Sequence, residues 1–245
     1  MTNWIEVGIF WAVLSIIDVV AISMWIKVSN RPDIKAKGIG LLLPFGMLSA
    51  MSFAVQIFAV KIASFNIAIV PVAVVLYVDM LVIVDIINEN YGRKMAFLLA
   101  VLSFIPGALM LGFSYLTTII SSPSFAVIPA WNSIFSFDVR IGLASFFTFF
   151  VDYLFDTRVY AKFKQIFKGK KLYVRYLVAE MPTLVIDSAV FITLAFYGTT
   201  AIIPLIEGQI EIKYLLGIPA IGLMYLSKYI IGRESSSTFN QILKQ

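Results

Sequence analysis

Residues 95–117 read MAFLLAVLSFIPGALMLGFSYLT, a run of 23 residues without one charged side chain. A bilayer core about 30 Å thick is crossed by a helix of roughly 20 apolar residues, so this run predicts a transmembrane helix. Six further stretches are apolar over a similar length: 4–26, 38–60, 67–87, 139–160, 176–197 and 214–231. The sequence therefore predicts an all-α, polytopic integral membrane protein with seven transmembrane helices.

The composition agrees with a membrane protein and excludes several other classes. Of 245 residues, 60% are hydrophobic and 13% are charged, whereas soluble proteins carry about 25% charged residues. The chain has no Cys and no His, which removes disulfides, cysteine-based zinc sites and imidazole catalysis. We expect neither a metal site nor a cofactor.

The basic residues indicate an orientation in the membrane rather than a nucleic-acid partner. The net charge is +5, but the Lys and Arg residues lie between apolar runs. Most of them fall in alternate connections, at 27–38, 88–95, 158–175 and 233–245, while the other side has only Lys61 and Lys213. Because cytoplasmic loops are enriched in Lys and Arg, we expect a cell-membrane protein with its N-terminus outside and its C-terminus in the cytoplasm.

Acidic and polar residues recur inside the apolar spans at helical spacing. An ionised Asp at the centre of a membrane helix costs about 2.5–3.5 kcal/mol, so each needs a partner, a proton or a wet cavity. Residues spaced three or four apart share one helix face. Four spans carry such a stripe: Ser49, Ser52 and Gln56; Asp85, Asn88 and Glu89; Ser145, Thr148, Asp152 and Asp156; and Glu180, Thr183 and Asp187.

These stripes have two interpretations. Turned inward, they would surround a polar cavity for protons, a cation or a ligand rich in hydrogen-bond donors. Alternatively, polar side chains hold membrane helices together, and Asp85 and Glu89 could pair with Arg93 or Lys94 near the interface. The deeper acids Asp152 and Asp187 favour the functional interpretation.

Three blocks resemble one transporter family. Residues 85–94, DIINENYGRK, resemble the D-x-x-N-E-x-Y-G-K-K signature of the queuosine precursor transporter family, also called the VUT or vitamin uptake transporter family. The second block is Arg140 to Ser145 with Asp156 and a basic 162–164, and the third starts at Ile186-Asp187-Ser188. Gln56 and Lys61 resemble a further N-x-x-x-x-K element, and the resemblance covers roughly residues 45–230.

The resemblance implies an architecture and a substrate. Family members have six core helices, so we expect residues 1–37 to form an extra N-terminal helix with its basic loop, 38–232 the core, and 233–245 a cytoplasmic tail. The implied activity is import of queuosine or archaeosine precursors, 7-deazaguanines such as 7-cyano-7-deazaguanine. Transport would be secondary, with protons as a plausible coupling ion given the excess of acids. The expected partners are this nucleobase-like molecule and the lipid bilayer.

The expected substrate-binding residues lie on the polar stripes. They are Gln56, Asp85, Asn88, Glu89, Arg140, Ser145, Asp152, Asp156 and Asp187. A carboxylate of Asp187, Asp156 or Asp152 could accept the ring N–H and exocyclic amine of a guanine-like edge. Gln56, Asn88 and Ser145 could meet the carbonyl and ring nitrogens, and Arg140 could balance an acid or gate the outer mouth.

Two other classes of function stay open. One is the substrate-binding membrane component of an energy-coupling-factor vitamin transporter, which would need a separate ATPase module because the chain has no G-x-x-x-x-G-K-[ST] loop. The other is an intramembrane enzyme built on carboxylates, with Asp156 and Asp187 as the pair that could act together. We favour a transporter that is not an enzyme.

Overall fold

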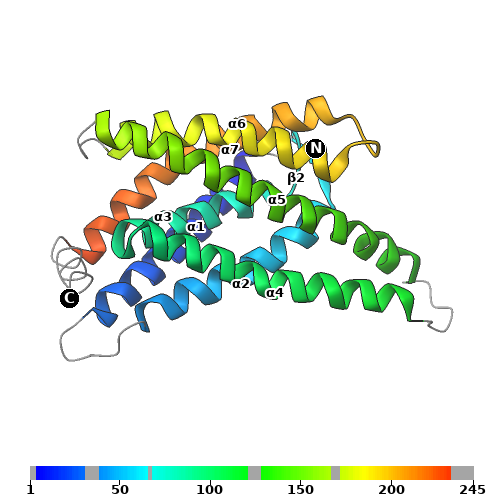
Figure 1. Cartoon of the computed structure of the whole chain (residues 1–245), viewed down its shortest axis with the longest axis horizontal. Coiled ribbons are helices and arrows are strands. Elements are labelled where there is room, and N and C mark those ends of the chain that lie inside the picture. Colours follow the sequence, from blue (N-terminus) through cyan, green and yellow to red (C-terminus); the bar gives the residue numbers. More distant parts are fainter. Residues whose placement is uncertain (1–3, 31–38, 66–67, 121–127, 167–171, 233–245) are drawn as a thin grey trace. The chain divides into compact units, whose positions relative to one another are not determined.

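The computed structural model describes residues 4–30, 39–65, 68–120, 128–166 and 172–232, and in these ranges seven helices and one hairpin (Figure 1). Side chains are described in the same ranges except at 4, 128, 136–138, 153–166 and 172–180. The helices are α1 (Trp4–Ser29), α2 (Ile39–Ala59), α3 (Ala73–Tyr91), α4 (Arg93–Ile119), α5 (Ile128–Ile166), α6 (Leu172–Phe196) and α7 (Ile202–Ile231).

The predicted all-α membrane fold is confirmed. Five helices contain a stretch that is long and apolar enough to cross a bilayer: α1, α2, α4, α5 over Pro129–Asp152, and α7. The described apolar part of α6, Met181–Phe196, is shorter. Helix α3 carries three acids within its 19 residues, which lowers its hydropathy.

Helix α7 begins earlier than the sequence predicts. The apolar run suggested a span from 214, but the helix starts at Ile202. Its first half contains Glu207, Glu211 and Lys213, whose charges hide the helix from a hydropathy average. In the structure Glu207 and Glu211 are exposed, while Lys213 is buried. The prediction that Lys213 lies in an outside connection is therefore wrong.

A small hairpin precedes α3 where the sequence predicts continuous helix from 67. Strands β1 (Ile62–Ser64) and β2 (Ile69–Pro71) pair antiparallel, with Ala63 opposite Val70. The helix begins only after Pro71, since proline fits a strand end or helix start but not a helix interior. Short apolar β-branched runs do not distinguish strand from helix by periodicity, which explains the difference.

The chain divides into two compact units, each drawn from separate segments. Unit 1 includes residues 56–74 and 108–215, and unit 2 includes residues 3–55, 75–107 and 216–245. Unit 1 thus holds the hairpin, α5, α6 and the first half of α7, and in it α5 packs along α6.

Helix α1 is an integral part of unit 2. Its Ser23 hydroxyl donates a 2.8 Å hydrogen bond to Ser227 of α7, and the indole N–H of Trp25 donates to the backbone carbonyl of Ile39 at 2.8 Å. One side of α1 is buried, including Val19. Large apolar side chains cover the opposite side, as expected for a surface that faces lipid: Ile9, Phe10, Val13, Leu14, Ile16 and Ile17.

Gly208 sets the contact between the hairpin and α7 in unit 1. A Cβ at this position would collide with the backbone of Ile69 in β2. A backbone carbonyl cannot rotate away, so we expect Gly208→Ala to cost about 1–3 kcal/mol through overpacking. We expect the detergent-solubilised variant to unfold at a lower temperature than the wild type. Size-exclusion chromatography of samples heated to increasing temperatures measures this difference.

Gly222→Ala is the matched control in the same helix. Nothing lies within 4 Å of a Cβ there. Because alanine is a better helix former by about 1 kcal/mol, this variant should unfold at the same temperature or higher. Equal stability of the two variants would contradict close packing of β2 on α7.

Candidate functional site

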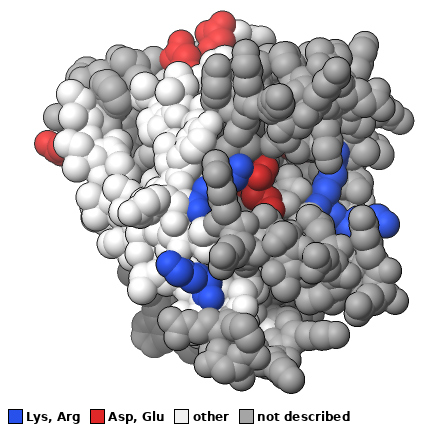
Figure 2. All heavy atoms as spheres, turned by 90° about the vertical axis from the view of Figure 1, so that its left-hand side faces the viewer, with Lys and Arg blue, Asp and Glu red and all other residues white. Residues whose placement is uncertain are grey.

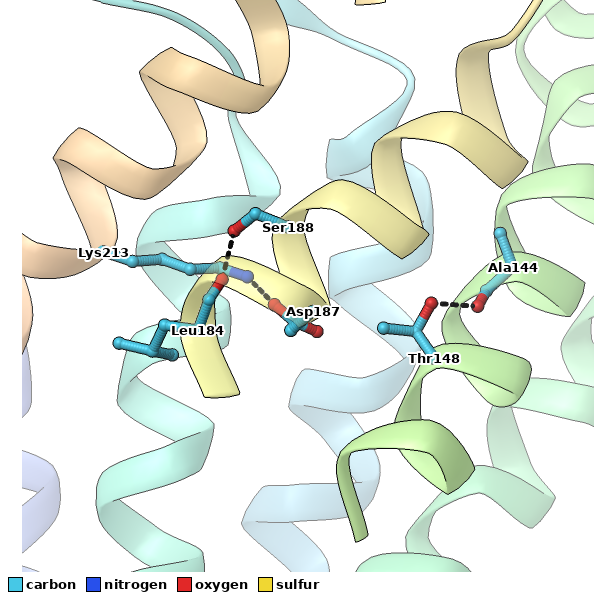
Figure 3. A network of polar contacts seen from close by, with 6 residues as sticks. All are labelled: Ala144, Thr148, Leu184, Asp187, Ser188 and Lys213. Atoms are coloured by element: carbon cyan, nitrogen blue, oxygen red, sulfur yellow. Dashed lines mark hydrogen bonds and ion pairs between the residues drawn. The ribbon is translucent and has the colours of Figure 1, made fainter. Parts of the chain in front are cut away.

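An ion pair lies at the centre of the buried polar residues of unit 1. Lys213 on α7 is 0% exposed, and its ammonium pairs with the carboxylate of Asp187 on α6, whose side chain is 5% exposed. Figure 3 shows the Lys213 side chain reaching across from its own helix toward Asp187. Helices α6 and α7 therefore bring opposite charges together at a place where Lys213 is fully buried and Asp187 almost fully buried.

Helical spacing explains why both side chains are turned to the interior. On α6, Thr183 and Asp187 lie one turn apart and are buried, and on α7 Gln209 and Lys213 do the same. The hydroxyl of Ser188 donates a 2.7 Å hydrogen bond to the backbone carbonyl of Leu184 in the same helix (Figure 3). The donor of Ser188 is therefore already used within α6. Thr183 and Asp187 of the predicted stripe on α6 thus lie on a buried face, and the side chain of Glu180 is outside the described part of the chain.

Asp152 adds a second carboxylate from α5. It attracts the Lys213 ammonium electrostatically, and its Oδ1 is buried. With all three groups ionised, two carboxylates act on one ammonium and the three charges sum to −1. These groups combine hydrogen-bond acceptors with a donor.

Buried neutral polar groups accompany these charges in unit 1. Gln56 at the end of α2 is 4% exposed and Gln209 is 5% exposed. The side-chain oxygen of each has no hydrogen-bond partner among the described residues. A buried acceptor without a hydrogen bond costs about 1–3 kcal/mol. A ligand that donates a hydrogen bond to either amide oxygen would remove this cost.

Two predicted site residues of α5 contact backbone carbonyls. The Ser145 hydroxyl donates to the carbonyl of Ile141 at 2.9 Å, within the helix. The Arg140 guanidinium donates to the carbonyls of Leu194 and Tyr197 at 2.9 and 2.7 Å. These carbonyls belong to the C-terminal end of α6, where helices leave acceptors unsatisfied. In this arrangement Arg140 fastens the end of α6 to α5.

The other predicted site residues lie elsewhere. Asp85, Asn88 and Glu89 belong to α3 in unit 2. Glu89 forms a 3.0 Å ion pair with Lys228 of α7, at a partly exposed position. Asp156 lies in α5, but its side chain is outside the described part of the chain.

Unit 2 contains a second pair of acids within its helices. Asp79 of α3 is buried, and its carboxyl lies close enough to that of Asp18 on α1 for the two to interact. The sequence placed neither residue on a polar stripe. Over the described ranges, no cluster of three or more Asp, Glu, His or Cys side chains could hold a metal ion.

Lys213 is the functional candidate that the sequence interpretation missed. The apolar run that predicts the last span begins at 214, which leaves Lys213 in the preceding connection. A usable signal did exist: Gln209 and Lys213 share a face with apolar Leu205 and Ile212, opposite Glu207 and Glu211. Helical periodicity, rather than average hydropathy, would have placed Lys213 inside.

Comparisons with known proteins identify one family. A family model described as "Putative vitamin uptake transporter" matches residues 71–227, which is more than half of the chain. The match includes Asp152, Asp187 and Lys213, whereas α1 and α2 precede it. No curated protein and no solved structure matches the chain.

The ion pair makes a prediction about stability. Lys213→Met leaves Asp187 without its ammonium, and breaking a buried pair costs about 3–5 kcal/mol. The double variant Asp187→Leu, Lys213→Met removes both charges and should regain most of that loss. Thermal unfolding in detergent measures both variants, and a double variant no more stable than the single one would contradict the pairing.

Proposed function

The chain belongs to the vitamin uptake transporter family, and we propose that it imports 7-deazaguanine precursors of queuosine or archaeosine. A polytopic helical fold and membership of a transporter family support transport across a membrane rather than catalysis. Family membership supports transport, and the identity of the cargo is what we propose in addition. The observation that carries this step is the buried carboxylate of Asp187 in unit 1, whose ammonium partner Lys213 is also attracted by the Asp152 carboxylate.

The chemistry of the cargo fits this cluster. A guanine-like edge presents a ring N–H beside an exocyclic amine, and one carboxylate can accept both donors. Hydrogen bonds to charged groups contribute about 1.5–3 kcal/mol each, more than those between neutral groups. We assign this contact to Asp187, which is buried and lies on the inner face of α6. A precursor with an aminomethyl cation would gain further from Asp152.

The remaining predicted residues complete the proposal. Gln56 has a free buried acceptor and could take the exocyclic amine or another donor of the ring. Asp85, Asn88 and Glu89 on α3 and Asp156 on α5 stay candidates for the transport path. Because acids predominate among the charged residues of these helices, protons are the proposed coupling ion of a secondary transporter.

Uptake in a bacterium that can neither make queuosine nor import its precursors tests the proposal. We expect the chain to restore queuosine in tRNA when 7-cyano-7-deazaguanine, its aminomethyl form or queuine is supplied. Asp187→Asn and Asp156→Asn should each reduce restoration at least about tenfold, since a lost charged hydrogen bond has that effect. Liquid chromatography with mass spectrometry of tRNA nucleosides gives the measurement.

Glu207→Gln is the matched control, because it changes an exposed acid of α7 to its amide. This control should restore queuosine as the wild type does. No restoration with any precursor, despite correct insertion, would contradict the cargo. Dependence on a co-purifying ATPase pair would instead indicate the energy-coupling-factor component, whereas activity of the lone chain in liposomes would exclude it.

We further propose a cell-membrane protein with its N-terminus outside. With Lys213 inside α7, the basic residues of the connections lie even more on one proposed side. Figure 2 shows Lys and Arg surfaces beside acidic ones on the face it draws. The asymmetry of Lys and Arg between connections is what the positive-inside rule uses.

Single-cysteine labelling tests this orientation without background, because the chain has no Cys of its own. Lys61 and Lys94 are both exposed and lie on opposite proposed sides. We expect a membrane-impermeant maleimide to label Lys61→Cys on intact cells and Lys94→Cys only after permeabilisation. The reverse pattern would overturn the orientation.

A further inference from the structure

We propose that Lys213 recognises a ring carbonyl of the cargo, so that Asp187 and Lys213 together read a lactam edge, a carbonyl beside a ring N–H. This inference rests on the proposed function and adds to it a residue that reads the ring carbonyl. The observation is the ion pair between α6 and α7, both of whose side chains are almost fully buried.

Stability alone does not account for this pair. Burying two charges costs several kcal/mol of hydration for each ion, and apolar residues of the same volume often stabilise a protein equally well. In a membrane protein, ionisable residues inside helices commonly mark pathways or binding sites. The pair is therefore better explained by a molecule that both groups contact in turn.

The pair matches a lactam edge in its hydrogen-bonding pattern. A carboxylate only accepts hydrogen bonds, and an ammonium only donates them. A lactam edge has the complementary order, with an N–H donor for Asp187 and a C=O acceptor for Lys213. When such an edge enters between the two groups, each exchanges one charged partner for one hydrogen-bond partner and neither is left unsatisfied.

Asp152 makes this exchange feasible. When Asp187 turns to the cargo, Lys213 would lose its counter-ion in a place without water. Asp152 attracts the same ammonium from α5, so it can keep that charge neutralised while the cargo is bound. Because two carboxylates act on one ammonium, one of them can bind the ligand while the other compensates the charge of the lysine.

Gln209 strengthens the assignment to this side of unit 1. It lies one helical turn before Lys213, is buried, and its amide oxygen has no hydrogen-bond partner among the described residues. An exocyclic amine next to the lactam edge would satisfy that oxygen. The described groups therefore offer the Lys213 ammonium to a carbonyl. They offer the Asp187 carboxylate and the Gln209 amide oxygen to N–H donors.

Two competitors that differ in the lactam edge test the proposal. We would measure how 7-deazaguanine and 2-amino-7-deazapurine each inhibit uptake of labelled 7-cyano-7-deazaguanine by the full-length protein. The second competitor lacks the carbonyl and, with it, the proton on the neighbouring ring nitrogen. In the wild type, 7-deazaguanine should inhibit at a concentration at least about tenfold lower. Equal inhibition by the two compounds, with uptake intact, would overturn the inference whatever the variants do.

Variants then assign the discrimination to Lys213. Lys213→Arg keeps a donor and should keep the ratio, whereas Lys213→Met should lower it several-fold. The part of the ratio that comes from the ring N–H accepted by Asp187 should remain. If the Met variant does not fold, Lys213→Gln, which keeps a neutral donor for Asp187, should still lower the ratio several-fold. Lys27→Met, at an exposed lysine of α1, is the matched control and should leave the ratio unchanged.

The outcomes separate the two proposals. Absence of uptake of every 7-deazaguanine would overturn the proposed function itself. If uptake occurs but Lys213→Met and Lys213→Gln keep the wild-type ratio of the two inhibitory concentrations, only the role of Lys213 is overturned. Lys213 would then be a counter-ion of Asp187. A ratio that falls in those variants and holds in Lys27→Met and Lys213→Arg would support recognition of the carbonyl.

Discussion

The absence of water from the hydrocarbon core is the constraint on which this structure depends, because every polar group there needs a partner inside the protein. Backbone groups meet it by forming seven helices and a paired hairpin in the described residues. Lys213 and Asp187 are partners for one another, and Arg140 donates hydrogen bonds to the backbone carbonyls at the end of α6. The same constraint makes such a pair sensitive to any ligand that offers equivalent hydrogen bonds.

Much of the fold follows from the sequence because length and hydropathy report directly on the bilayer. The uncharged run at 95–117 lies within α4, and the spacing of Thr183 and Asp187 gives their common buried face. The first half of α7 was missed because an average over a window adds Glu207 and Lys213 together, although they lie on different faces. The ion pair between Lys213 and Asp187 is seen only in the three-dimensional structure, because the spacing of residues within one helix does not show which residues of another helix they contact.

Helix α1 illustrates the difference between family and structure. It precedes the matched residues, yet it is bonded into unit 2 through Ser23 and Trp25 and buries Val19 there. Its Asp18 also meets Asp79 of α3. The expected division at residue 37 follows chain order, whereas the compact units combine segments that are distant in sequence.

The ion pair also bears on how the protein is made. Asp187 is synthesised 26 residues before Lys213, a delay of about 1–5 seconds at ribosomal speed. During that interval α6 carries a carboxylate whose partner does not yet exist, and lipid disfavours it. Insertion of α6 and α7 together as a helical hairpin avoids this exposure. Loss of either charge would then reduce the yield of inserted protein at biogenesis, before the first molecule of cargo is met.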